Sequence, residues 1–312
     1  MKLVPRLLAI LSSGYILFFF SEQFFWARVR PEDTIGNWLM TWLVYSVLAY
    51  VMLATIQQFH VRSGWALFLV GALVGWLAEG LIVQTAYESL PLSISFTGLA
   101  WHAILSVWIG WYGLQRLVRS NQYGKTTLIS ALIGVGWGFW SVSWWLEEGE
   151  VVTPWGEYAA FVLLSSLLLI GSYALYAWVS TTPFVPQRRG LLAAALFFAF
   201  WFLFNTLPAT PIATLILPLL LLSLYLPLRR HRAGGEGSLY EMLVGRGRVL
   251  SYLCLLPLPL MASLVYGLAL LLNLRLHSNW IVYLICTPLG FIFWGLAIFR
   301  LWRQPSVAVL SS

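Results

Sequence analysis

The chain has 312 residues, of which 60% are hydrophobic and 9% charged, and its mean hydropathy is +0.83. A water-soluble domain is nearer to half apolar and a quarter charged, so the composition excludes one. The 18 Trp, 19 Phe and 14 Tyr residues exclude a disordered chain, and two cysteines exclude a disulfide-stapled fold. The net charge of +7 contains no basic run of the length that grips phosphates, which argues against nucleic acid as a partner. The sequence therefore predicts a membrane protein.

A transmembrane helix needs about 20 mostly apolar residues, because every backbone polar group inside the bilayer must be bonded within its own segment. This criterion predicts an all-α, polytopic transmembrane bundle in a single membrane domain, residues 1–312. The seventh and eighth segments are joined by Leu207-Pro208-Ala209-Thr210-Pro211. They form either two spans or one re-entrant hairpin, and we favour two spans. The ten expected spans are residues 7–25, 35–57, 65–85, 96–117, 127–146, 158–179, 190–207, 211–228, 249–272 and 280–302.

The distribution of charge predicts the orientation, because cytoplasmic loops retain lysine and arginine. With the N-terminus inside, fifteen of the eighteen basic residues fall on the inner side, and only Arg28, Arg30 and Arg275 fall on the outer side. Nine of the eleven acidic residues fall in outer loops or in the outer halves of spans. We therefore expect both termini in the cytoplasm, an inner-membrane location, and a first span that is retained as an anchor rather than removed as a signal peptide.

Two further patterns concern organisation. Trp76–Val83 and Trp145–Val152 share Trp, Leu, Glu, Gly and Val at matching positions, so helix pairs 65–118 and 127–179 are either a parallel repeat or a chance likeness. The spacings Gly71-x-x-x-Gly75 and Gly134-x-x-x-Gly138 predict close helix packing. The inner loop 229–248 combines arginines, glycines and an apolar stretch, which is typical of either an amphipathic interfacial segment or a plain topology anchor.

Glu79 and His102 form the best candidate functional pair in the chain. Glu79 lies near the outer end of its span, where an ionised carboxylate must face protein, find a partner or be protonated. His102 lies on the next helix, which runs antiparallel to the first, so the two side chains are expected at the same depth. Ionisable residues inside a membrane are more often functional than not, although a lone histidine can also serve as a simple interhelical hydrogen bond.

Other carboxylates are expected at the same level. Glu148, at the end of the fifth span, is the third predicted site residue, and Glu22, Glu88 and Glu157 lie nearby. Such a group can ligate a divalent metal, perform acid–base catalysis or carry protons, and Glu79, His102 and Glu148 are the candidate metal ligands. With so few histidines available, the metal alternative is the weaker one. The tryptophans at 137, 140, 144 and 145 are expected in an aromatic belt at the membrane interface.

The sequence favours an intramembrane enzyme, a hydrolase or transferase, acting on a lipidic or amphipathic substrate in an outer-leaflet pocket. In this pocket Glu79 would be the general base or metal ligand, His102 its proton partner or co-ligand, and Glu148 a second carboxylate. A proton- or cation-coupled transporter and a structural subunit of a larger membrane complex, with partner membrane subunits, are the alternatives. No phosphate-binding glycine motif is present, so a nucleotide is not an expected cofactor.

Overall fold

The computed structural model describes residues 3–146, 152–233, 238–243 and 245–303, and all regular structure within these ranges is helical. Ten helical stretches in the described chain are long and apolar enough to cross a membrane, and each boundary lies within four residues of the predicted one. The pair between 188 and 232 forms two such stretches, as favoured above. The ten stretches are Leu3–Trp26, Ile35–Gln58, Gly64–Ile82, Ile94–Arg119, Tyr123–Leu146, Trp155–Val179, Arg188–Ala209, Ala213–Arg232, Val249–Leu271 and Ser278–Arg303.

Several of these spans combine more than one type of helical turn. The α-helices are α1 (Leu3–Phe18), α2 (Phe24–Trp26), α3 (Ile35–Gln58), α4 (Gly64–Leu77), α5 (Gln115–Arg119), α6 (Tyr123–Ser141), α7 (Trp155–Val179), α8 (Arg188–Trp201), α9 (Leu207–Ala209), α10 (Ala213–Ala233), α11 (Val249–Leu253), α12 (Pro257–Leu271) and α13 (Ser278–Arg303). The π-helical segments are η1 (Phe19–Gln23), η2 (Ala78–Ile82), η4 (Ile94–Leu114) and η6 (Phe202–Thr206). Short 3₁₀ turns are η3 (Thr85–Tyr87), η5 (Val142–Leu146) and η7 (Leu239–Leu243).

Polar caps define where two of the central helices begin. The hydroxyl of Thr34 accepts a hydrogen bond from the Asn37 N–H at the start of α3, and Ser63 accepts one from the Ala66 N–H at the start of α4. Each cap satisfies a backbone donor that has no partner within its own helix. These two residues therefore fix the register of the helices that carry Tyr45 and Glu79.

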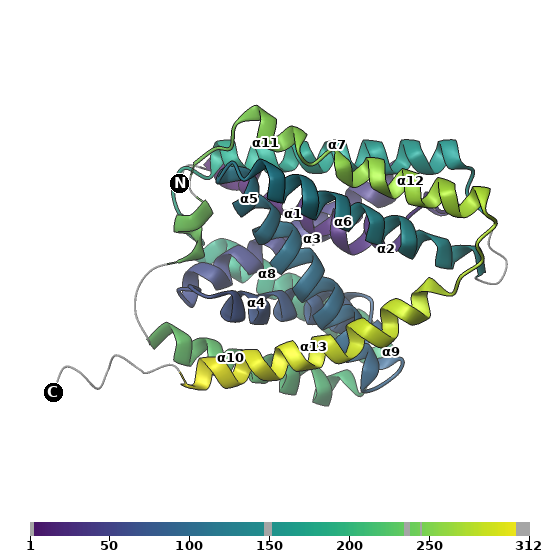
Figure 1. Cartoon of the computed structure of the whole chain (residues 1–312). Coiled ribbons are helices and arrows are strands. Elements are labelled where there is room, and N and C mark those ends of the chain that lie inside the picture. Colours follow the sequence, from purple (N-terminus) through teal and green to yellow (C-terminus); the bar gives the residue numbers. More distant parts are fainter. Residues whose placement is uncertain (1–2, 147–151, 234–237, 244, 304–312) are drawn as a thin grey trace.

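The spans run side by side along one axis (Figure 1). α1 begins and α13 ends at the same end of this bundle, as an even number of spans requires. The opposite end contains the last turns of α2 and η2 and the first turns of η4 and α7. We call it the acidic end, because it carries Glu22, Glu79, Glu88 and Glu157.

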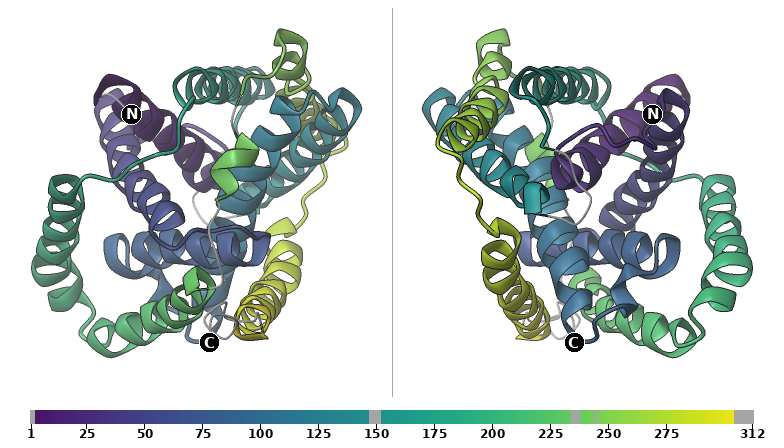
Figure 2. Two further views of the ribbon diagram at one scale, coloured as in Figure 1. Left: turned by 90° about the vertical axis from the view of Figure 1, so that its left-hand side faces the viewer. Right: turned by 90° about the vertical axis from the view of Figure 1, so that its right-hand side faces the viewer.

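The core lies where α1, α4 and η4 meet. α1 packs against α3 and α7, α4 packs against η4, and α6 packs along α12. α8, α10 and α13 lie at the periphery (Figure 2) and bury far less of their surface than α4 does. The peripheral helices therefore present mainly apolar side chains outward, as a bilayer requires.

The predicted close packing at the glycine spacings is confirmed. A Cβ atom on Gly75 would overlap the backbone carbonyl of Gly98, so α4 and η4 touch through their backbones. Gly134 and Gly138 of α6 meet the carbonyl groups of Leu258 and Ala262 on α12 in the same manner. Small residues at these positions let helices approach closely in a membrane, where no hydrophobic force drives them together.

The expected aromatic belt is wrong for the tryptophans of α6. Trp137 and Trp140 are 0% and 4% exposed, so they lie inside the bundle and not at its lipid-facing surface. Trp137 stacks on Phe24 at 5.2 Å between ring centroids, and Trp140 contacts Trp101 at 5.0 Å. These rings connect α6 to α2 and η4 beneath the acidic end, which stabilises the segment that carries the site described below.

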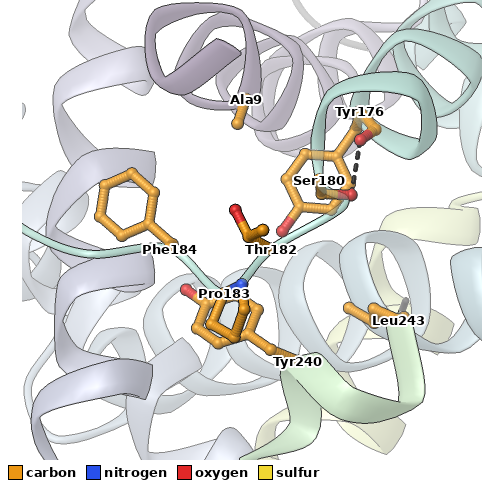
Figure 3. A pocket seen from close by; sticks show the side chains of 8 residues that line it. All are labelled: Ala9, Tyr176, Ser180, Thr182, Pro183, Phe184, Tyr240 and Leu243. Atoms are coloured by element: carbon orange, nitrogen blue, oxygen red, sulfur yellow. Dashed lines mark hydrogen bonds between the residues drawn. The ribbon is translucent and has the colours of Figure 1, made fainter. Parts of the chain in front are cut away.

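At the other end, η7 packs into the bundle. Leu239, Tyr240 and Leu243 are buried, and the Tyr240 hydroxyl donates to the backbone carbonyl of Leu53 at 2.7 Å. Burial raises the pKa of Tyr240 well above its usual value. Figure 3 shows the small pocket between this turn and the end of α7, where the Ser180 hydroxyl donates to the Tyr176 carbonyl. Its volume of about 10 Å³ holds about one water molecule, so it has no room for a substrate.

Candidate functional site

Glu79 and His102 meet inside the membrane-spanning region. The Nε2 atom of His102 lies 2.7 Å from the Oε1 atom of Glu79, and the two side chains are 2% and 12% exposed. Glu79 belongs to η2, and His102 belongs to η4, the antiparallel helix that packs on α4. Their convergence agrees with the expectation from sequence. Burial of an acid beside an imidazole makes this pair a group that can hold or release a proton.

The second ring nitrogen of His102 continues into a chain of hydroxyl groups. Nδ1 lies 3.0 Å from the Ser21 hydroxyl, and Ser21 lies 3.0 Å from the Ser106 hydroxyl. The Ser106 hydroxyl donates to the backbone carbonyl of Trp101 at 3.1 Å. Ser21 comes from η1, so this chain links the first span to the fourth.

The direction of these hydrogen bonds depends on the protonation of His102. A charged imidazolium donates from Nε2 to Glu79 and from Nδ1 to Ser21, which then donates to Ser106, and every proton has an acceptor. A neutral ring with its proton on Nε2 instead accepts at Nδ1 from Ser21, whose single proton no longer reaches Ser106. Loss of the His102 proton therefore reverses the Ser21 hydroxyl, which is the behaviour of a proton relay.

A second acidic pair lies beside the first. The Tyr45 hydroxyl donates to Oε1 of Glu22 at 2.8 Å, and the Trp26 indole N–H donates to Oε2 at 3.1 Å. The Tyr45 ring stacks on the His102 ring at 6.2 Å between centroids. The two pairs are therefore neighbours: Tyr45 is hydrogen-bonded to Glu22 and stacked on His102, which is in turn bonded to Ser21 and Glu79.

Three of the site's elements are π-helical segments. Ser21 and Glu22 lie in η1, Glu79 lies in η2 and His102 lies in η4. A π-helix has i→i+5 hydrogen bonds and occurs frequently at functional sites, because it widens the helix and redirects side chains. The Trp101 indole N–H donates at 2.9 Å to the backbone carbonyl of Phe20, which fixes η1 against η4. This contact sets the position of Ser21 relative to His102.

The loop after η2 supports Glu79 from the acidic end. The Thr85 hydroxyl donates to Oε2 of Glu79, and the Tyr87 hydroxyl donates to the backbone carbonyl of Gly80 at 2.7 Å. Burial raises the pKa of Tyr87 to about 12, so its hydroxyl remains a donor throughout the physiological range. Both carboxylate oxygens of Glu79 thus have a donor, and the turn that carries it is fixed on both sides.

We expect Tyr87→Phe to destabilise the folded chain by about 0.5–1.5 kcal/mol, the usual contribution of one hydrogen bond. The phenyl ring keeps the packing and removes only the donor to Gly80. The measurement is the unfolding midpoint in detergent, with Tyr225→Phe, at a ring that is 46% exposed on α10, as the control. Equal midpoints for the two variants would show that the Tyr87 bond contributes nothing to stability.

Glu22 connects the network to an open cavity. The cavity has a volume of about 260 Å³, lies at the acidic end, and is lined by Glu22 together with Gln23, Arg28, Arg30, Asp33 and aromatic residues. Ser21 and His102 are 5% and 1% exposed, so they lie behind this wall. A substrate in the cavity would therefore touch Glu22, while the Glu79–His102 pair would act on it through the relay.

The predicted metal site fits the geometry poorly. Both ring nitrogens of His102 are used in hydrogen bonds, to Glu79 and to Ser21, which leaves no nitrogen for a metal ion in this arrangement. Within the described ranges, no group of three histidine, cysteine or acidic side chains is placed to hold a metal. Glu148, the third predicted site residue, lies outside the described residues, as do Glu147 and Glu150.

Sequence reasoning did not identify Ser21 or Tyr45, and it placed Glu22 only near the site. Ser21 and Tyr45 are not ionised, so they carry no signal of cost inside a membrane, and many serines and tyrosines of this chain occupy ordinary positions. One signal was available: Ser21 directly precedes the only acidic residue of the first span.

Protein-family profiles, curated proteins and solved structures were each compared with the chain, and none of the three comparisons finds a match.

Proposed function

We propose that the chain is an intramembrane enzyme, a hydrolase or transferase, that performs acid–base chemistry on a lipidic or amphipathic substrate. We place it in the cytoplasmic membrane with both termini inside, so that the acidic end faces the outer leaflet, in agreement with the positive-inside bias of the sequence. The observation that carries the proposal is that Tyr45 lies between a cavity-lining carboxylate, Glu22, and a buried acid–imidazole pair: its hydroxyl donates to Glu22 and its ring stacks on His102.

We assign a role to each group. Glu22 contacts the substrate in the cavity and takes a proton from it or gives one to it. Tyr45 and Ser21 pass the proton between Glu22 and His102, and Glu79 stabilises the imidazolium that forms. A buried carboxylate oriented on the far ring nitrogen of a histidine is the arrangement by which hydrolases hold the base in one tautomer. Glu148 remains a proposed second carboxylate beside this site.

The chain as folded does not expose Ser21 as a nucleophile. Ser21 is 5% exposed and hydrogen-bonded on both sides, so a substrate carbonyl has no approach to it in this conformation. We therefore assign Ser21 to proton transfer rather than to covalent catalysis. Glu22, which lines the cavity, is the only relay member that we place in contact with substrate.

We expect Glu22→Gln and His102→Gln each to abolish lipid conversion, because each removes a titrating group from the relay. The test incubates the purified chain in liposomes of natural membrane lipids and follows changes in lipid mass over time. Glu88→Gln is the matched control, since Glu88 is an exposed acid of the adjacent loop. Conversion at the wild-type rate by folded Glu22→Gln and His102→Gln, or no conversion by the wild type, would contradict the proposal.

A proton-coupled transporter is the second candidate. It is favoured by the burial of the Glu79–His102 pair, which a proton can reach through the relay and a bulky substrate cannot. This function would give proton flux in sealed proteoliposomes that is lost in Glu79→Gln, with no chemical change in any lipid. The two measurements therefore separate the candidates, because one follows covalent change and the other follows pH.

A further inference from the structure

A long apolar groove continues from the polar cavity at the acidic end. The groove has a volume of about 860 Å³ and lies between α1, α3 and α7, and its walls are mainly apolar. Phe18, Gln23, Trp38 and Phe161 line both the groove and the cavity, so the two spaces adjoin. A single ligand with one polar end and one apolar end can therefore occupy both.

The length of the groove suits a lipid chain. Along α7 its lining residues extend from Glu157 to Leu175, which corresponds to about 27 Å at a rise of about 1.5 Å per residue. The hydrocarbon core of a bilayer is about 30 Å thick. The groove therefore follows the membrane normal from the cavity toward the opposite face, and a hydrocarbon chain that enters it remains at its normal depth in the bilayer.

The charged side chains that line the cavity indicate which kind of lipid headgroup it would bind. Arg30 is neutralised by Asp33 at 2.9 Å and by Glu32 at 3.3 Å. Glu22 accepts hydrogen bonds from Tyr45 and Trp26, and both of these donors are uncharged. Among the described ion pairs, none includes Glu22. A cationic group of a ligand would complement this carboxylate.

We propose that this combined space binds an amine-bearing phospholipid, with its primary ammonium group at Glu22 and one hydrocarbon chain in the groove. The inference rests on the proposed function in one respect, since it names the substrate class for the same site. It does not require that the bound lipid be converted. A primary ammonium donates hydrogen bonds to Glu22, whereas a quaternary ammonium has no N–H to donate.

The test measures lipid retained by the purified chain in detergent. Phosphatidylethanolamine, phosphatidylcholine and phosphatidylglycerol with identical chains are added separately, and bound lipid is counted by native mass spectrometry after gel filtration. We expect phosphatidylethanolamine to be retained about tenfold more strongly than the other two, the ratio expected from one charge-assisted hydrogen bond. Equal retention, which is the behaviour of ordinary surrounding lipid, or preference for phosphatidylglycerol would overturn the inference.

Two variants locate the binding. Gly171 lines the groove and has no atom within 4 Å of the position that a Cβ would take, so Gly171→Trp should fill the groove without disturbing α7. It is expected to lower retention of phosphatidylethanolamine at least fivefold, about the effect of 1 kcal/mol of lost burial. Gly136→Trp is the matched control on α6, where a Cβ also meets open space but no groove residue is altered. Equal loss in both variants would overturn the assignment of the groove.

Failure of this inference and failure of the proposed function are distinguishable. Glu22→Gln should remove the preference for phosphatidylethanolamine, whereas His102→Gln, behind the cavity wall, should keep it while losing conversion. Selective binding without any conversion would contradict the enzyme and retain the lipid site. Conversion of a lipid that is not an amine-bearing phospholipid, with equal retention of all three lipids, would retain the enzyme and contradict the lipid site.

Discussion

Gly75→Ala is expected to give a large loss of stability, because the new methyl group would overlap the backbone of Gly98 rather than a movable side chain. Overpacking of this kind costs about 1–3 kcal/mol, and more where neither backbone can move. Gly75 lies one helical turn before Glu79, so separation of α4 from η4 would also pull Glu79 away from His102. The measurements are the unfolding midpoint in detergent and lipid conversion, both of which should fall.

The control for this prediction is Gly136→Ala in α6, where the added methyl group meets open space. Alanine is favoured over glycine inside a helix by about 0.5–1 kcal/mol, so this variant should be neutral or slightly more stable than the wild type. If Gly75→Ala behaves like Gly136→Ala, the close contact between α4 and η4 is not present in the membrane, and the pairing of Glu79 with His102 loses its structural support.

The Glu79–His102 pair is expected to show strong energetic coupling in a double-mutant cycle. Each single change to alanine leaves the other buried polar group without its main partner, whereas the double change removes both. We expect a coupling free energy of about 1–2 kcal/mol, the upper part of the range for interhelical hydrogen bonds inside membranes. The cycle is measured by reversible unfolding in mixed micelles.

A parallel cycle with Glu88→Ala and His102→Ala supplies the reference. Glu88 is exposed in the loop after η2 and has no described contact with the imidazole, so the two changes should be additive within about 0.5 kcal/mol. If the Glu79 cycle is equally additive, the short distance between these side chains has no energetic consequence, and the relay that we assign to them is wrong.

The spans and the depth of the acidic pair could be predicted from sequence because both depend on local sums. Hydropathy over about 20 residues fixes a span, and position within a span fixes depth, so Glu79 and His102 were expected at one level. The depth of a residue does not reveal the direction of its side chain around the helix. In a helix that is apolar on all sides the hydrophobic pattern has no preferred face, and Tyr45 could not be directed to Glu22 by pattern alone.

The tryptophans of α6 also show that sequence does not reveal the direction of a side chain around its helix. Trp137 and Trp140 are near a span end, where an aromatic belt and a buried cluster have the same composition. Only the neighbouring helices distinguish the two, since Trp137 is covered by Phe24 and Trp140 by Trp101. The orientation of the chain and the parallel repeat stay predictions.

The direction of the Glu79 side chain depends on the number of residues in the π-helical segment η2. In η2 each hydrogen-bonded ring encloses one more residue than an α-turn, so removal of one residue from Ala78–Ile82 would allow ordinary α-helix to run through this segment. The residues beyond the deletion would keep nearly their present facing, because the wide turn takes up the extra residue, but the widened backbone that redirects Glu79 would be lost. The number of residues in this turn, and not their hydrophobicity, therefore sets the direction of the Glu79 carboxylate. A shortened turn would leave an intact span without the contact between Glu79 and His102.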